Sequence, residues 1–176
     1  MENNLEEILK QKIRNIPDFP QKGVIFKDIT PLLNDGEYFQ KAIKAIAENY
    51  RGKNIDLIVA SEARGFIIGS ALAHELGVGF VPVRKAGKLP YKTLKHEYEK
   101  EYGKDSLEIH TDAIIVGQKI LICDDVLATG GTINATKELV KKLGGDIVGF
   151  CFLIELLFLK GRDQFAGFDI FSLIQY

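Results

Sequence analysis

Short apolar runs alternate with amphipathic segments through most of this chain, and this alternation limits the possible folds more than any other feature. Helical spacing of apolar residues appears at 65–76 and at 133–143, each closed by a glycine. Runs typical of buried strands lie around these helices, at residues 56–60, 78–83, 119–123, 147–154 and 169–173. Strands that alternate with amphipathic helices favour a largely parallel sheet flanked by helices on both faces. The sequence therefore predicts the α/β class.

The first part of the chain has a different pattern. Residues 3–15 and 36–50 have apolar positions at helical spacing, and the prolines of the 17–20 segment end the first of these two helices. Between them, residues 23–35 are predicted to be irregular. A chain of 176 residues suits one domain, 1–176, with a single sizeable core.

The charge balance excludes some classes of partner. Lysine and arginine total 23 and aspartate and glutamate total 24, which gives a net charge of −1. Such a balance gives no general attraction to nucleic acid or to an anionic membrane, so neither is an expected partner. The polar start of the chain is unlike a signal peptide, and no apolar run approaches a membrane span in length. The expected location is cytoplasmic.

The cysteines and histidines suggest no metal site. Cys123 and Cys151 each lie in an apolar run and are predicted to be reduced core residues. The histidines, His74, His96 and His110, lack the spacing of metal ligands. We therefore expect no metal cage made of protein side chains.

A long, highly charged stretch at 84–112 interrupts the alternation. A segment this long inside one domain is typically functional or disordered. Residues 106–110 alternate between apolar and polar side chains, which predicts a short hairpin within it. A solvated surface excursion is the alternative interpretation.

The most specific segment is residues 120–132, where an apolar strand leads into two aspartates, a glycine-containing turn and a helix. The first N–H groups of a helix lack partners within it, and the helix dipole favours an anion there. Glycines let the backbone approach such an anion closely. Thr132 could instead cap the helix. The residues predicted to bind a phosphate are Ala128, Thr129, Gly130, Gly131 and Thr132.

Asp124 and Asp125 stand directly before this turn, although carboxylates repel a phosphate. They are therefore expected to contact another part of the same ligand. Vicinal sugar hydroxyls suit them because carboxylates accept hydrogen bonds, and a magnesium ion is the other candidate. Together the two features predict a site for a ribose that carries a terminal phosphate.

A second anion site is predicted at residues 61–65, between a strand and the start of a helix. Arg64 can hold phosphate oxygens with its planar guanidinium group. A surface salt bridge is the alternative interpretation of Arg64.

The segment 120–132 resembles the signature of the type I phosphoribosyltransferases, which bind 5-phosphoribosyl 1-pyrophosphate. Segments 17–31, 60–66 and 83–90, and the ending 155–162, resemble the adenine phosphoribosyltransferase family in the same order. The resemblance covers nearly the whole chain. It implies the type I phosphoribosyltransferase fold, with a small hood made of about residues 1–35 and 155–176 and a long flexible catalytic loop at 84–112.

The resemblance implies a magnesium-dependent reaction of purine salvage. Adenine and 5-phosphoribosyl 1-pyrophosphate would give AMP and pyrophosphate, and the enzyme would be a homodimer. Magnesium would arrive with the pyrophosphate and could lie near Asp124 and Asp125, and no protein cage would hold it.

Roles for single residues follow from the same resemblance. The general acid or base would be Glu101, with Tyr102 beside it, and the implied non-proline cis peptide is Glu62–Ala63. The other implied catalytic residues are Asp124, Asp125 and Lys88. Pyrophosphate would lie against Glu62, Ala63, Arg64, Arg84, Lys85 and Lys88. The adenine pocket would consist of Ile25, Phe26, Lys27 and Leu156.

Two alternatives stay open. One is the same chemistry on another base, and the other is a regulator that senses 5-phosphoribosyl 1-pyrophosphate and binds DNA. The short segment before Pro17 and the net charge of −1 argue against the regulator. One departure from the family is the apolar run 156–159, which could enlarge a surface used in dimer packing.

Overall fold

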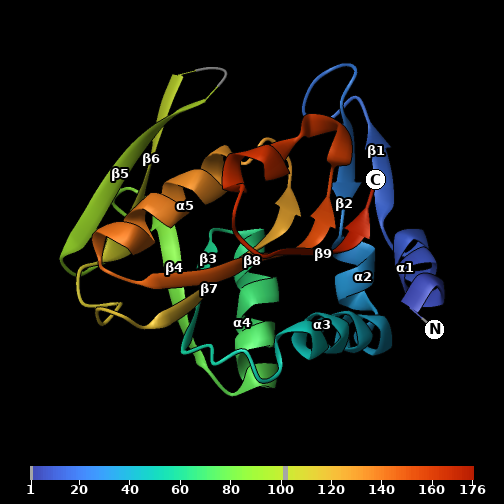
Figure 1. Ribbon diagram of the computed structural model, residues 1–176. Coiled ribbons are helices and arrows are strands. Elements are labelled where there is room, and N and C mark those ends of the chain that lie inside the picture. Colours follow the sequence, from blue (N-terminus) through green and yellow to red (C-terminus); the bar gives the residue numbers. More distant parts are fainter. Residues whose placement is uncertain (1, 101–102) are drawn as a thin grey trace.

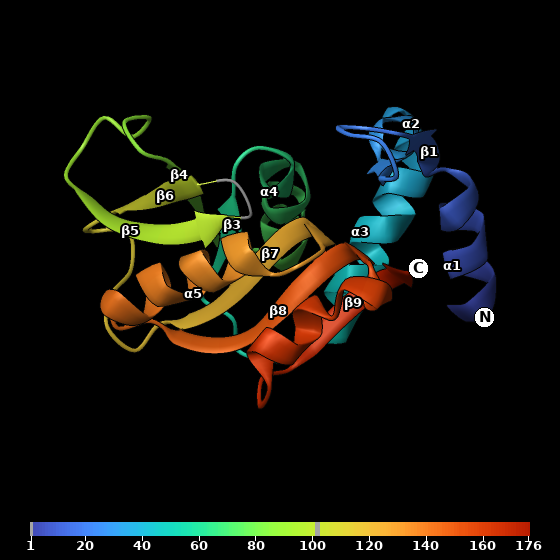
Figure 2. The same cartoon turned by 90° about the horizontal axis from the view of Figure 1, so that it is seen from above.

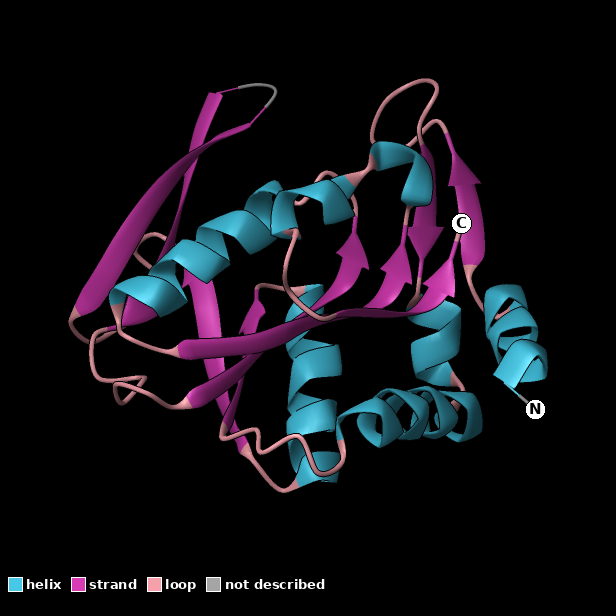
Figure 3. Ribbon diagram, in the orientation of Figure 1, coloured by secondary structure: helices cyan, strands magenta, loops and turns pink. Residues whose placement is uncertain are grey.

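The computed structural model describes residues 2–100 and 103–176, with the side chains of 5–98 and 105–176. Its main sheet is built from β3 (Leu57–Ser61), β4 (Gly79–Lys85), β5 (Thr93–Lys100), β6 (Gly103–His110), β7 (Lys119–Leu127), β8 (Asp146–Glu155) and β9 (Ile170–Gln175). The order across the sheet is β5-β6-β4-β3-β7-β8-β9 (Figures 1 and 3). Strands β4, β3, β7, β8 and β9 pair in parallel, and β6 joins β4 in antiparallel fashion. The predicted largely parallel sheet is confirmed.

Helices cover both faces of this sheet. The helices are α1 (Glu2–Gln11), α2 (Thr30–Asn34), α3 (Gly36–Tyr50), α4 (Arg64–Leu76) and α5 (Gly131–Lys142). Seen from above, α5 lies on one side of the sheet and α3 and α4 lie on the other (Figure 2). Local sequence sets their ends: the Asp35 carboxylate accepts a hydrogen bond from the Tyr38 N–H and caps α3, and Gly77 ends α4 in the left-handed conformation at φ 70°.

The two faces of the sheet bury separate apolar clusters. Successive residues of a strand point to opposite faces, and β7 follows this rule. Leu121 and Cys123 join the cluster beneath α3 and α4, while Ile120 and Ile122 join the cluster beneath α5. The prediction that Cys123 and Cys151 are reduced and buried is confirmed.

The N-terminal region is more regular than predicted. The first helix ends at Gln11 rather than at residue 15, and the chain then forms β1 (Arg14–Pro17). The stretch 23–35, predicted to be irregular, contains β2 (Ile25–Asp28) and α2. Strands β1 and β2 pair in antiparallel fashion, which ends the helix early because the same backbone groups make the ribbon.

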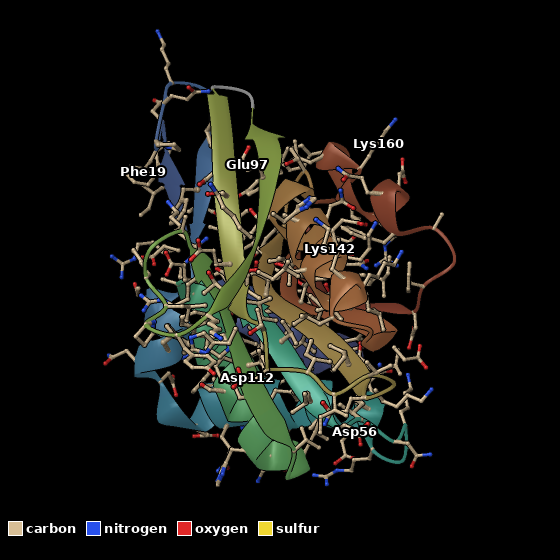
Figure 4. The ribbon with its side chains drawn as sticks, turned by 90° about the vertical axis from the view of Figure 1, so that its left-hand side faces the viewer. Phe19, Asp56, Glu97, Asp112, Lys142 and Lys160 are labelled. Carbon is tan, nitrogen blue, oxygen red and sulfur yellow. The ribbon has the colours of Figure 1, made fainter. Side chains whose placement is uncertain are left out.

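The charged stretch 84–112 forms more strand than predicted. Strand β4 continues to Lys85, and β5 and β6 pair from Thr93–His110 to Lys100–Gly103. The apolar residues Leu107 and Ile109 of β6 are buried. Figure 4 faces the hairpin, and its Glu97 label lies at the same end of the molecule as the labels of Phe19 and Lys160. The flexibility of this stretch stays a prediction.

Two short 3₁₀ helices, η1 (Leu157–Leu159) and η2 (Gly161–Phe165), connect β8 to β9. Strand β7 runs on to Leu127, beyond the predicted end at residue 123, because Val126 and Leu127 continue to pair with β8. The acidic pair therefore lies inside the strand. Its parallel neighbours end at the same edge of the sheet, where ligands of such folds bind.

Candidate active site

A cleft of about 570 Å³ opens at the carboxyl edge of the parallel strands. Its walls come from β2, from the connection between β3 and α4, from the end of β7 with the turn into α5, and from the segment after β8. The cleft brings together most of the residues predicted to bind the substrates, and the roles themselves stay predictions. The members of that predicted set that line it are Ile25, Phe26, Lys27, Glu62, Ala63, Arg64, Asp124, Asp125, Ala128, Thr129, Gly130, Gly131, Thr132 and Leu156.

The turn before α5 has the geometry of an anion site. Gly130 precedes the helix at φ 89°, in the left-handed region, so the helix begins at Gly131. The alternative in which Thr132 caps the helix is wrong, because Thr132 already lies in the first turn and the N-cap residue, Gly130, has no side chain to form a cap. The N–H groups of this first turn therefore face the cleft without a capping side chain.

The segment η2, which follows β8, packs against this turn. The added Cβ of any larger residue at Gly161 would lie 2.1 Å from the carbonyl oxygen of Ala128, so only glycine fits there. The side-chain amide of Gln164 donates to the carbonyl of Thr129. From the sequence, Gly161 was matched to the family but given no role, and Gln164 was not predicted at all. Both residues contact a turn more than 30 residues away in the sequence, which leaves no local signal.

The hairpin approaches the same turn from the other side. A Cβ at Gly131 would lie 4.0 Å from the ring of Tyr98 on β5. Tyr98 was not among the predicted site residues. The predicted residues Glu101 and Tyr102 lie outside the described residues.

The two aspartates of β7 differ in environment. Asp125 is 5% exposed, and its Oδ2 lies 2.8 Å from Nε of Arg64. That contact is an ion pair whose angles do not make a hydrogen bond, so Asp125 Oδ2 is a buried acceptor without a hydrogen-bond donor. Such an oxygen is suited to a ligand hydroxyl or a cation.

Burial shifts the titration of both carboxyl groups. It raises the pKa of Asp124 well above its ordinary value, and the neighbouring charge of Asp125 adds to the rise. Burial also raises the pKa of Asp125, although the Arg64 guanidinium opposes that rise. Asp124 is held close to α4, since a Cβ at Gly65 would lie 2.5 Å from its Oδ1. Gly65 belongs to the predicted anion site 61–65, but its closeness to Asp124 was not predicted.

The second predicted anion site contains its own counter-charge. The Glu62–Ala63 peptide is cis, as predicted from the resemblance. The carboxylate of Glu62 lies 2.8 Å from Nε of Arg84 and 3.1 Å from Nζ of Lys88. Burial would raise the pKa of Glu62, but the hydrogen bonds from Arg84 and Lys88 outweigh it and hold the pKa below its ordinary value.

Arg84 and Lys88 are therefore turned toward Glu62 in this structure. Neither lines the cleft, and Lys85 does not line it either, being exposed at the end of β4. A pyrophosphate bound here would have to attract these cations away from Glu62 or join the cluster beside it. Arg64 makes the ion pair that was the alternative interpretation, but its partner, Asp125, lies in the cleft and not on the outer surface.

The predicted base pocket is an exposed apolar wall. Ile25 is 58% exposed, and the guanidinium carbon of Arg64 lies 4.8 Å from the centre of the Phe26 ring. Nζ of Lys27 is 3.5 Å from the centre of the Tyr176 ring and donates to the Asn15 side chain, so the Lys27 ammonium group interacts with these two residues. A flat ring placed against this wall would cover apolar surface that water now contacts.

The described residues contain neither a cluster of metal-ligating side chains nor a membrane-spanning helix. Within residues 2–100 and 103–176, no group of three or more histidine, cysteine, aspartate or glutamate side chains gathers in a way that could hold a metal ion. No described helix has both the length and the apolar character needed to cross a membrane.

The chain is similar in sequence to a known family and to known proteins. Residues 32–173 match the family described as "Phosphoribosyl transferase domain". The adenine phosphoribosyltransferase of Thermoanaerobacter sp. (strain X514) is 59% identical over 172 residues, which cover 98% of this chain and 99% of that protein.

The chain is also similar in structure to solved adenine phosphoribosyltransferases. The crystal structure of adenine phosphoribosyltransferase from Thermoanaerobacter pseudethanolicus is 57% identical, with a TM-score of 0.94, and the match covers 97% of this chain and 99% of that one. The Saccharomyces cerevisiae enzyme, complexed with an imino-altritol bisphosphate and adenine, is 43% identical with a TM-score of 0.91, over 97% and 99% of the two chains. The chain therefore belongs to the phosphoribosyl transferase family and, within it, to the adenine phosphoribosyltransferases.

Proposed function

We propose that this chain transfers the 5-phosphoribosyl group from 5-phosphoribosyl 1-pyrophosphate to adenine, giving AMP and pyrophosphate, with magnesium. The observation that carries the proposal is that one cleft contains both segments predicted to bind anions, together with a buried carboxylate oxygen that lacks a hydrogen-bond donor. The membership of the chain in the adenine phosphoribosyltransferases supports the same reaction, as does the adenine bound in the yeast relative.

The 5′-phosphate would lie at the start of α5. The N–H groups of the first turn would donate to its oxygens, and the hydroxyl of Thr129 or Thr132 would add a further donor. The helix dipole favours the phosphate there. Because Gly161 and Gln164 support this turn, the donors would already be in place before the ligand arrives.

The ribose would lie over the aspartates. Asp125 Oδ2 has no hydrogen-bond donor and would accept a bond from a ribose hydroxyl. As the bond from the sugar carbon to pyrophosphate breaks, positive charge develops on the ring. Anionic groups beneath the ring would stabilise that charge.

The leaving pyrophosphate would lie between residues 62–64 and the cations that follow β4. Its charge grows as the bond breaks, and Arg64, Arg84, Lys85 and Lys88 would neutralise it. Arg84 and Lys88 would exchange part of their contact with Glu62 for contact with the pyrophosphate. Glu101 would act as the general acid or base for the proton of the base, and closure of the 84–112 loop with Tyr102 would exclude water.

Magnesium fits this site as a companion of the substrate. The unpartnered oxygen of Asp125 and the neighbouring Asp124 are oxygen donors of the kind magnesium prefers. Few protein ligands and several phosphate oxygens are typical of magnesium with pyrophosphate. When bound, the ion would neutralise charge on the leaving group.

Adenine would lie against Ile25, Phe26 and Leu156. Backbone groups near Ile25 and Lys27 would distinguish its amine donor and ring acceptor from the reversed pattern of a 6-oxopurine. This contact would decide which base reacts.

We further propose that two copies associate and that the reaction serves purine salvage in the cytoplasm. The adjacent residues Leu157, Phe158 and Leu159 are 48%, 71% and 38% exposed, which supports association through an apolar surface. Two free buried thiols fit a reducing compartment.

Release of pyrophosphate, measured with 5-phosphoribosyl 1-pyrophosphate, magnesium and one base at a time, tests the reaction. The proposal predicts turnover with adenine and little with hypoxanthine, guanine, xanthine or orotate. Turnover with another base alone would keep the reaction class and reject the base assignment. Tight binding of the sugar phosphate without turnover on any base would favour the regulator.

A further inference from the structure

Four polar or charged side chains are buried in the part of the chain that the structure describes. Asp125 and Glu155 each face an arginine. The other two, Ser61 at 1% exposure and Thr136 at 0%, are neutral hydroxyls that contact each other across the boundary between β3 and α5. Apolar side chains could fill this contact, so the hydroxyl pair calls for an explanation.

Each hydroxyl has one proton to donate, and this sets the direction of the two hydrogen bonds that Thr136 Oγ1 makes. Thr136 Oγ1 lies 3.0 Å from the carbonyl oxygen of Thr132, and Ser61 Oγ lies 2.9 Å from Thr136 Oγ1. A carbonyl oxygen can only accept, so the one hydroxyl proton of Thr136 goes to Thr132. Ser61 must then donate to Thr136. The two bonds form a directed chain from the end of β3 to the first turn of α5.

This hydrogen-bond chain ends at the two segments that we propose bind anions. Ser61 is the last residue of β3 and directly precedes Glu62 and Ala63, which line one side of the cleft. Thr132 belongs to the phosphate turn on the other side. Neither Ser61 nor Thr136 lines the cleft, so the pair joins the two segments from behind.

A hydrogen-bonded link of this kind fixes distance and direction, whereas apolar packing between β3 and α5 would permit sliding. A fixed separation matters most to a ligand that carries an anion at both ends and must fit both segments at once. It matters less to a ligand that occupies one segment only.

We propose that Thr136, with Ser61 as its donor, is a positioning residue that sets the separation of the 5′-phosphate turn from the pyrophosphate segment. The ligand that depends on it is a ribose with a phosphate at one end and a pyrophosphate at the other. This inference rests on the proposed function and adds a residue that touches no substrate.

Three variants separate positioning from stability. The double variant Ser61→Ala with Thr136→Val removes both hydroxyls and leaves no unpaired donor, so its melting temperature stays close to that of the parent. Thr136→Ser keeps the hydroxyl chain and loses a buried methyl group, so its melting temperature falls. Ile46→Val removes a methyl group from α3, away from the cleft, and serves as the matched control for lost stability.

The readouts are the KM for 5-phosphoribosyl 1-pyrophosphate, the KM for adenine, kcat, and the dissociation constant of AMP. The double variant is expected to raise the KM for 5-phosphoribosyl 1-pyrophosphate by about threefold to tenfold, the equivalent of one hydrogen bond. Its KM for adenine and its affinity for AMP stay near those of the parent. Thr136→Ser and Ile46→Val keep the parental KM although both melt earlier.

An active double variant with an unchanged KM would overturn the inference while leaving the proposed function intact, and so would KM values that follow the melting temperatures across the set. Equal weakening of AMP and 5-phosphoribosyl 1-pyrophosphate would also overturn it, because the pair would then shape one segment only. A parent enzyme that releases no pyrophosphate from 5-phosphoribosyl 1-pyrophosphate would overturn both proposals.

Discussion

At the scale of single residues, the aspartates of β7 combine burial with incomplete pairing. Asp125 Oδ2 is buried and lacks a hydrogen bond, and its charge is balanced by Arg64, whose side chain is 38% exposed. A buried carboxylate in this state is costly unless a ligand completes its contacts. The arrangement favours ligand binding over stability of the free protein.

Asp125→Asn should lower kcat/KM for 5-phosphoribosyl 1-pyrophosphate by about tenfold to a hundredfold, the loss expected for a hydrogen bond to a charged group. The shape of the side chain is kept and its charge is removed. Asp146→Asn is the matched control, because Asp146 pairs with Lys119 on the surface at the opposite end of β8. Steady-state kinetics at saturating adenine measure the difference. Parental kinetics in Asp125→Asn would contradict the assigned contact with the ribose.

Gly65→Ala should reduce kcat/KM with little loss of stability. The new methyl group would lie 2.5 Å from Asp124 Oδ1, so the carboxylate must move, while alanine suits the helix better than glycine does. Gly36→Ala is the control, since open space surrounds the equivalent position in the first turn of α3. The comparison of kcat/KM and melting temperature for both variants tests this. A fully active Gly65→Ala enzyme would show that the position of Asp124 is not critical.

At the scale of elements, the phosphate turn depends on a partner distant in sequence. Residues 161–165 of η2 pack against the turn, and the ion pair of Arg162 with Glu155 anchors this segment to β8. Ser172 of β9 also donates to the Glu155 carboxylate. The turn and its support are therefore one structural unit.

Gly161→Ala should weaken AMP binding by about tenfold to a hundredfold, because a methyl group 2.1 Å from the carbonyl oxygen of Ala128 must displace the turn. Adenine binding should be unchanged, since the base wall does not include Gly161. Calorimetric titration with AMP and with adenine measures both affinities. Equal loss for the two ligands would instead indicate general unfolding of the cleft.

The elements that sequence reasoning predicted well are those with strong local periodicity. The helices at 36–50 and 65–76 and the buried strands were placed within a few residues. The β1–β2 ribbon was missed because its order comes from pairing between strands, which leaves little local signal. The end of β7 was misplaced because Asp124 and Asp125 look like a strand end, while pairing with β8 carries the strand through them.

At the scale of the whole molecule, buried carboxyl groups should give opposite contributions to the pH dependence of stability. The pKa of Asp124 is raised by burial, so its stabilising contribution is complete below the ordinary carboxyl pKa and is lost as the pH rises through the raised value. The Arg162 guanidinium holds the pKa of Glu155 below its ordinary value. That contribution is present above the ordinary value and is lost as the pH falls.

Asp124→Asn should therefore melt higher than the parent near neutral pH, by about 3 °C for each kcal/mol of relieved burial, and the gain should shrink toward about pH 4. Glu155→Gln should melt lower than the parent near neutral pH, with its deficit also shrinking as the pH falls. Thermal melts of the free protein between about pH 4 and pH 8 test both signs. A destabilised Asp124→Asn at neutral pH would contradict the account of its burial.

The candidate site shows where sequence reasoning stops. The acidic pair, the phosphate turn and Arg64 were predicted because local motifs carry their chemistry, and the structure brings them to one cleft. The orientation of Arg84 and Lys88 toward Glu62 could not be predicted, since it depends on packing of separate strands. The Ser61–Thr136 contact was equally hidden, because residues 75 apart in sequence give no local signal.

The most direct test of the account is a crystal structure of this chain with AMP bound. We expect the phosphate at the N–H groups of residues 130–132, a ribose hydroxyl on Asp125, and the adenine ring against Phe26 and Leu156. Arg64 would then share Asp125 with the ribose. A phosphate bound instead at residues 62–64, or an adenine ring away from Phe26, would contradict the assignment of the two anion sites and of the base wall.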